Sequence, residues 1–172
     1  MVTVGYDYYL GCYLSGMFAG KFSGSGKLGY IGGISIPPLN ADFNAMKAGA
    51  MSVNAKIEVT PAFAGSFQDP VKGHEIASQM YQSGIDYIQT DSAATDTGII
   101  QAANEGKDKF VSAISPAQYK LGPKTVMAIV QLDFGMSLRN EAIKALGPDW
   151  KNGHVHTDLS SGVIDFKLSD VF

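Results

Sequence analysis

The stretch Lys27-Leu-Gly-Tyr-Ile-Gly-Gly-Ile-Ser-Ile-Pro-Pro38 decides the fold of this chain. Its first part, residues 27–34, alternates apolar residues with glycine, which is typical of a buried strand. The strand must end before Pro37 and Pro38, because proline cannot donate a hydrogen bond to a central ladder. Asn40 is the predicted cap of a helix that follows. The stretch therefore predicts a strand that leads directly into a helix.

The same alternation continues along the chain. Strands are predicted at residues 27–34, 56–62, 87–90, 109–115 and 125–131, and helices at 6–22, 40–51, 69–84, 95–106 and 137–146. Two closing strands, 153–157 and 162–166, are expected at the sheet edge. Strands that alternate with helices imply right-handed βαβ units. We therefore expect an α/β fold with a doubly wound, mainly parallel five-stranded sheet of flavodoxin-like order. A single lobe is expected to span residues 1–172.

The composition favours a well-packed domain and excludes several classes of partner. Of the 172 residues, 45% are apolar and 17% are charged, and the net charge is −3. A chain of this length buries about 70% of its unfolded surface. Its lysines and arginines are scattered singly, so neither nucleic acid nor an anionic membrane surface is an expected partner. No run approaches the roughly 18 apolar residues of a membrane span.

Cys12 is the single cysteine, which excludes an intrachain disulfide and a cysteine-based metal cluster. Tyr9-Leu-Gly-Cys12 resembles a lipoprotein cleavage site. However, only eleven residues precede the cysteine, they include Asp7, and no cationic segment begins them. We interpret Cys12 as a small apolar residue on a helix face.

Two motifs suggest a cofactor or a metal but lack the context that either needs. Gly24-Ser-Gly-Lys-Leu-Gly29 matches a dinucleotide-binding pattern, yet it precedes a strand instead of following one. It is read as a turn, and no cofactor is expected. His154 and His156 share one strand face, and Asp158 could join them, but the third histidine, His74, belongs to a distant helix. No metal site is expected.

Catalytic side chains are also incomplete. Ser66, Ser92 and Ser115 lie in loops that could converge, but no histidine is predicted beside them. Asp91 and Asp96 could act as an acid–base pair. We interpret them instead as a solvated loop residue and a helix cap, so no enzymatic activity is expected.

The carboxyl ends of the strands form the expected ligand crevice. The residues predicted there are polar and uncharged, with one aromatic ring: Ser35, Phe67, Gln68, Ser92, Thr95, Ser115, Gln118 and Gln131. The predicted ligand-binding residues are Phe67, Ser92, Thr95, Ser115, Gln118 and Gln131. The Phe67 ring could stack on a base, and the hydroxyl and amide groups would fix its orientation.

Three segments carry a family resemblance: residues 27–38, Gly65-Ser-Phe-Gln-Asp-Pro-Val-Lys-Gly-His-Glu-Ile-Ala77, and Gly84-Ile-Asp-Tyr-Ile-Gln89. In order and spacing they resemble one lobe of the basic membrane protein family, the extracytoplasmic nucleoside-binding proteins of ABC importers. The resemblance implies a type I periplasmic binding protein, in which two α/β lobes close over a purine nucleoside. The family's first lobe would precede Tyr6, so the chain resembles the second lobe alone.

The resemblance also shows departures at the binding positions. Ser115 stands where the family has an aspartate for the ribose hydroxyls, Ala117 replaces a second aspartate, and Gln131 replaces a lysine. Losing these charge-assisted hydrogen bonds should weaken nucleoside binding. Two functions therefore stay open. One is solute binding for an importer, with a small polar or purine-nucleoside-like ligand and an ABC permease as partners. The other is a non-catalytic interaction or regulatory module that forms a homo-oligomer through its exposed face. The resemblance implies an extracytoplasmic, membrane-anchored protein.

Overall fold

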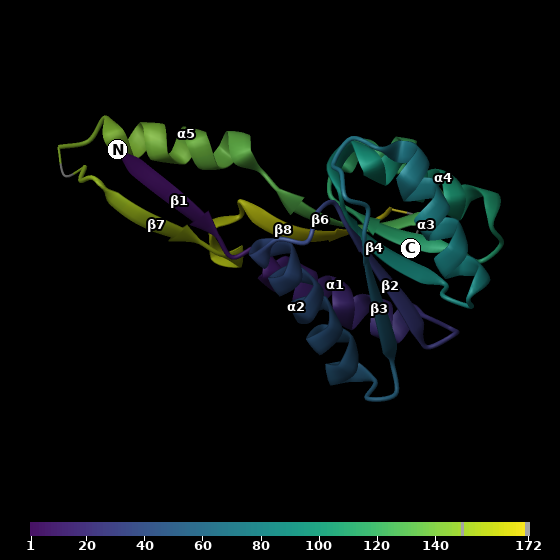
Figure 1. Cartoon of the computed structure of the whole chain (residues 1–172). Helices are drawn as coiled ribbons and strands as arrows, with labels where there is room; N and C mark the ends of the chain where they lie inside the picture. The colour runs from purple at the N-terminus through teal and green to yellow at the C-terminus, as the bar shows by residue number, and fades with distance from the viewer. Residues whose placement is uncertain (149, 171–172) are drawn as a thin grey trace.

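The core of the molecule is a six-stranded sheet with strands in the order β3-β2-β4-β5-β6-β8 (Figure 1). The computed structural model describes residues 1–148 and 150–170. Five strands run parallel: β2 (Lys27–Gly32), β3 (Glu58–Phe63), β4 (Tyr87–Asp91), β5 (Phe110–Ala113) and β6 (Val126–Leu132). Their order confirms the expected flavodoxin-like sheet. The sixth strand, β8 (Ile164–Leu168), pairs antiparallel with β6 and forms an edge.

Helices cover both faces of this sheet. Helices α1 (Tyr9–Phe22) and α2 (Pro37–Val53) cover one face, and α3 (Pro70–Gln82) and α4 (Asp96–Glu105) cover the other. Because side chains alternate along a strand, Tyr30 and Tyr87 pack toward α1 and α2, whereas Ile31 and Ile88 pack toward α3 and α4. The doubly wound arrangement is therefore confirmed.

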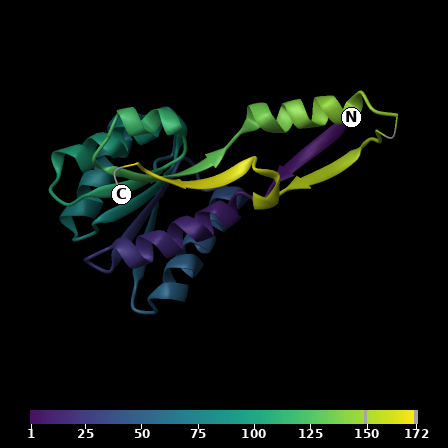
Figure 2. The ribbon, with the colours of Figure 1, turned by 180° about the vertical axis from the view of Figure 1, so that it is seen from behind.

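A second, two-stranded sheet extends from this core lobe. Strand β1 (Val2–Tyr6) pairs in parallel with β7 (Gly153–Thr157), and helix α5 (Phe134–Ala145) lies beside them (Figures 1 and 2). We call these three elements the extension. The expectation that residues 153–157 lie at the edge of the main sheet is wrong, since they pair with β1, a strand that the sequence pattern does not predict. The chain passes between the core lobe and the extension three times, after β1, β6 and β7.

Several helix ends follow the local chemistry. Asp69 caps α3, because its side chain accepts a hydrogen bond from the Lys72 amide at 2.9 Å, as predicted. Helix α2 begins at Pro37, earlier than the predicted cap Asn40, because proline suits the first turn. The described residues also form three short 3₁₀ helices, η1 (Ala93–Thr95), η2 (Pro116–Lys120) and η3 (Leu159–Ser161). Within the described residues, no helix has the length and apolar character needed to cross a membrane.

Glycine lets α1 and α2 approach very closely. A Cβ atom at Gly16 would lie 2.0 Å from the Met46 carbonyl oxygen, and one at Gly49 would lie 2.0 Å from the Tyr13 carbonyl oxygen. No side chain larger than hydrogen fits at either position without moving a backbone. This contact fixes the position of α2, and with it the side chains that α2 directs toward the carboxyl ends of the strands.

Candidate functional site

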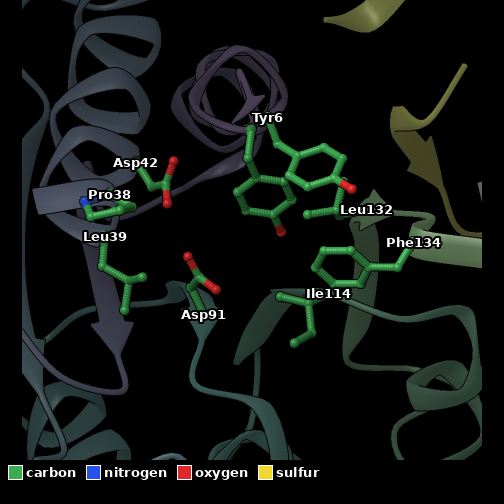
Figure 3. A pocket seen from close by; sticks show the side chains of 9 residues that line it. Tyr6, Pro38, Leu39, Asp42, Asp91, Ile114, Leu132 and Phe134 are labelled. Atoms are coloured by element: carbon green, nitrogen blue, oxygen red, sulfur yellow. The ribbon is translucent and has the colours of Figure 1, made fainter. Parts of the chain in front are cut away.

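A cavity of about 410 Å³ lies where the core lobe meets the extension (Figure 3). Its lining comes from the carboxyl ends of the strands, the first turns of α2 and the beginning of α5: Tyr6, Tyr8, Pro38, Leu39, Asp42, Asp91, Ile114, Leu132 and Phe134. Strand ends of a parallel sheet meet at one edge, which is the usual place for a ligand crevice. A cavity thus lies at the edge of the sheet where the ligand crevice is expected. The residues that line this cavity differ from the predicted ligand-binding residues.

Two carboxyl groups form the charged part of the lining. Asp42 on α2 is only 5% exposed, and its side chain hydrogen-bonds the carboxyl group of Asp91 at the end of β4. The Tyr30 hydroxyl donates to Asp91 Oδ2 at 3.2 Å. Within the described part of the chain, no lysine or arginine forms an ion pair with either aspartate.

Burial changes the charge state of this pair. Desolvation, followed by the charge of Asp91, raises the pKa of Asp42 to about 8. Desolvation, followed by the charge of Asp96, raises the pKa of Asp91 to about 6. Near neutral pH the pair therefore holds a shared proton and about one negative charge. The interpretation of Asp91 as a solvated loop residue is wrong, because it is the last residue of β4 and its carboxyl group contacts Tyr30 and Asp42.

Aromatic rings form the opposite wall. The rings of Tyr6 and Phe134 meet edge to face, with centroids 5.4 Å apart. The Tyr6 hydroxyl lies 2.9 Å from Ser137 Oγ, and the Tyr8 hydroxyl donates to the Val130 carbonyl oxygen at 2.7 Å. Desolvation raises the pKa of Tyr8, so its hydroxyl stays neutral. With both hydroxyls engaged inside the protein, Asp42 and Asp91 are the charged groups that face the cavity.

Three of the predicted ligand-binding residues are buried and form hydrogen bonds with other groups of the protein. Ser92 donates to Asp96 Oδ1 from its amide at 2.9 Å and from its hydroxyl at 2.6 Å. Gln118 donates to Asp96 Oδ2 at 3.1 Å and accepts from the Ser115 amide at 2.9 Å. Thr95 accepts from the Asp69 amide at 2.9 Å. Asp96 is thus a fully buried acceptor.

The other three predicted residues make separate contacts within the protein. Ser115 caps η2 through the Ala117 amide, and Gln131 accepts a hydrogen bond from Lys167 at 3.0 Å. The ring of Phe67 lies against Gly33, where a Cβ would approach it to 2.2 Å. The structure brings Ser92 and Gln118 together around Asp96, and none of the six residues belongs to the lining of the cavity.

Sequence reasoning missed most of the lining for identifiable reasons. The sequence pattern predicts that Tyr6 and Tyr8 belong to a helix, whereas they lie at the end of β1 and in the link to α1. Asp42 did carry a signal. It follows Leu39 by three residues and precedes Met46 by four, so a carboxyl group occupies the buried stripe of α2. A charged residue on such a stripe is seldom placed there for stability.

The histidines lie away from this cavity. On β7, the Nε2 atoms of His154 and His156 are 3.2 Å apart, and His156 Nδ1 is 3.5 Å from Asp7. His74 pairs with Glu105 at 2.9 Å. The described residues include no group of three or more side chains arranged to hold a metal ion. The glycine-rich segment 24–29 spans the turn from α1 into β2, as its position before a strand predicts.

Sequence comparison identifies relatives along the whole chain. A family model described as ABC transporter substrate-binding protein PnrA-like matches residues 1–172. Basic membrane protein B of Borreliella burgdorferi (strain ATCC 35210 / DSM 4680 / CIP 102532 / B31) is 33% identical over 177 positions, covering 100% of this chain and 52% of that protein. Basic membrane protein A of Borreliella afzelii is 31% identical, covering 91% and 49%. The chain spans about half the length of these curated relatives.

Solved structures share the fold. A transcriptional activator of the comK gene from Bacillus halodurans superposes with a TM-score of 0.87 at 18% identity, covering 99% of this chain and 59% of that one. An ABC transporter solute-binding protein from Aeropyrum pernix K1 gives a TM-score of 0.82 at 19% identity, covering 96% and 49%. The fold is that of type I periplasmic binding proteins. By its sequence, this chain belongs to the family of PnrA-like substrate-binding proteins of ABC transporters.

Proposed function

We propose that this chain forms one side of the solute-binding cleft of an ABC importer, and that the solute binds in the cavity beside Asp42 and Asp91. The observation that carries the proposal is the position of the cavity, at the carboxyl ends of parallel strands and at the junction with the extension. In this proposal the core lobe is the second lobe of the binding protein, and the extension is part of the first.

The family supplies the rest of the proposal. The importer's permease is the expected partner, and the protein works outside the cytoplasm. The proposed solute is small and polar, and a purine nucleoside is one candidate. No chemical step is proposed, because the family to which the chain belongs binds solutes for transport.

The residues predicted from sequence have supporting roles in this proposal. Ser92, Thr95 and Gln118 hold the loop that follows β4, and through it the position of Asp91. Phe67, Ser115 and Gln131 are half-buried and stay candidates for the outer rim of the cleft. Their contribution to affinity is expected to be smaller than that of the lining.

Calorimetric titration tests this function. The chain is titrated with a panel of nucleosides, bases, sugars and amino acids, and weak binding is expected because the other lobe would supply further contacts. Phe134→Ala should weaken whichever solute binds. Leu138→Ala is the matched control, since it lies on the same helix, is 74% exposed and does not line the cavity. The proposal is overturned if nothing in the panel binds or if Phe134→Ala has no effect.

A second candidate function rests on α5. Phe134, Leu138 and Leu146 at this helix are 62%, 74% and 89% exposed, and apolar side chains gathered on one element often mark an interaction surface. An interaction or regulatory module would use this surface to form a homo-oligomer. Light scattering separates the two functions. A concentration-dependent dimer that Leu138→Glu disrupts favours the module, and a monomer that binds a solute favours the importer.

A further inference from the structure

The Asp42 carboxyl group lacks a partner of opposite charge. It is 95% buried, it faces the cavity (Figure 3), and its one hydrogen-bond partner among the described residues is the carboxyl group of Asp91. A buried negative charge is costly unless a cation or several donors compensate it. Among the described residues, the neutral donor to the pair is the Tyr30 hydroxyl, which donates to Asp91. The pair therefore has capacity for a positively charged donor that the described chain does not supply.

The surroundings of the pair strengthen this conclusion. The titratable side chains that interact electrostatically with Asp42 or Asp91 are Tyr8, Cys12, Tyr30 and Asp96. None of these four side chains carries a positive charge. The cavity lining contains no lysine, arginine or histidine. An anionic solute would meet only repulsion, and a neutral solute would leave the negative charge uncompensated.

The remaining lining fits the body of an organic cation. Tyr6, Tyr8 and Phe134 contribute aromatic rings, whose faces attract cations. Leu39, Ile114 and Leu132 add an apolar surface. A volume of about 410 Å³ is within the usual range for small-molecule sites. Carboxylates that face aromatic rings across an apolar cavity are a combination that recognises a compact amine.

We propose that the solute of this cavity is an organic cation, a protonated amine or quaternary ammonium compound, whose charge lies between the Asp42–Asp91 pair and the rings of Tyr6 and Phe134. The proposal rests on the proposed function, since it assumes that the cavity is a solute site. The new proposal adds the chemical class of the solute. It also implies that binding of the cation is accompanied by release of a proton from the Asp42–Asp91 pair.

The experiment uses three cations with matched neutral analogues. The 172-residue chain is titrated by calorimetry with 2-phenylethylammonium against 2-phenylethanol, 1,5-diaminopentane against 1,5-pentanediol, and choline against 3,3-dimethylbutanol. Adenosine is included as a neutral nucleoside. At pH 8 at least one cation is expected to bind about tenfold or more tightly than its neutral analogue, as expected for an added charge-assisted contact. Binding should weaken at pH 5.5, where the pair is protonated, and should release a proton near pH 7.

Substitutions assign the effect to the pair. Asp42→Asn and Asp91→Asn should each reduce the affinity for the cation by about tenfold or more, and should change the affinity for the neutral analogue little. Two variants are used so that one remains informative if the other folds poorly. Asp165→Asn is the control, because it removes the same charge from β8, outside the cavity lining.

The outcomes separate this inference from the proposed function. If adenosine or another neutral solute binds in the cavity while all three cations fail, the inference is overturned and the solute-binding function stands. Equal affinity for cations and analogues, or cation binding that survives both substitutions, also overturns it. If neither the cations nor the panel of neutral solutes binds, both proposals fail.

Discussion

The carboxyl group of Asp42 on α2 hydrogen-bonds the carboxyl group of Asp91 at the end of β4. Two acidic groups can share a hydrogen bond only while one of them keeps its proton. The pair is therefore a cost to folding when both are ionised, because burial separates the charges from water. Buried charged groups that lower stability beside a cavity, as this pair does, are typical of binding sites, where function requires the charge.

This pair should make stability depend on pH. An aspartate in the unfolded chain has a pKa of about 3.9, whereas the pKa of Asp91 is about 6 and that of Asp42 about 8 in the fold. Between these values the folded state binds more protons than the unfolded state, so the contribution of the pair falls as pH rises from about 4 to 8. Urea unfolding at pH 5 and pH 8 measures the change.

Asp42→Asn should remove most of that dependence. At pH 8 the variant is expected to be more stable than the wild type by on the order of 1–3 kcal/mol, and at pH 5 the two should be similar. Asp165→Asn serves as the control for a general change in charge, because Asp165 is partly exposed on β8. A wild-type slope retained in full by Asp42→Asn would contradict the assignment.

Asp96→Asn should have the opposite effect. Asp96 accepts hydrogen bonds from the Ser92 amide, the Ser92 hydroxyl and the Gln118 amide group. An asparagine presents an NH₂ group to one of these donors, which leaves buried donors unpaired. The expected loss is about 1–3 kcal/mol in the free energy of unfolding. Denaturant unfolding at pH 7 measures it, and an unchanged midpoint would show that the network is dispensable.

The main sheet was predictable because its signals are local. Strands β2, β5 and β6 are short, largely apolar runs, and several of the following helices begin at a cap or a proline, as at Asp69 and Pro70. The β1–β7 pair carries no such signal. Its register joins Val2 to Gly153 across nearly the whole chain, and the histidines at 154 and 156 make β7 look like an exposed edge. Pairing at that distance depends on the tertiary fold.

The site was less predictable than the sheet for a related reason. A polar residue after a strand predicts a group that faces a ligand, yet Ser92 and Gln118 donate hydrogen bonds to the buried carboxylate of Asp96 instead. The same residue types serve both purposes, and only burial distinguishes them. Asp91 was recognised as a candidate, but its partner Asp42 comes from a helix 49 positions earlier, which the close contact of α1 and α2 brings near.

Gly16→Ala should test that helix contact. The new methyl group would meet the backbone carbonyl of Met46, which cannot move without shifting α2, so a loss of about 2–3 kcal/mol in stability is expected. Gly11→Ala on the same helix is the comparison. There the new group meets a side-chain methyl of Val130 at 2.7 Å, which can adjust more easily, and the loss should be smaller. Thermal unfolding of both variants gives the order, and an equal loss would argue against the close contact.

Gly33 and Phe67 offer the sharpest test of the loop beyond β2. The Phe67 ring fills the space where a Gly33 side chain would lie, with 2.2 Å between a built Cβ and the ring. Gly33→Ala alone should cost about 1–3 kcal/mol, because the ring must leave its position. Phe67→Ala alone should also destabilise, since half-buried ring contacts are lost.

In the double variant the two costs should not add. Once the ring is removed, the methyl group at position 33 has room, so Gly33→Ala is expected to be nearly neutral in the Phe67→Ala background. The resulting coupling energy should be about 1–2 kcal/mol in a double-mutant cycle measured by urea unfolding. Purely additive costs would show that the ring does not pack on Gly33. Titration of Phe67→Ala with any solute that binds then separates its two roles, because a packing residue lowers stability with little effect on affinity, whereas a stacking platform should lose about 1–3 kcal/mol of binding.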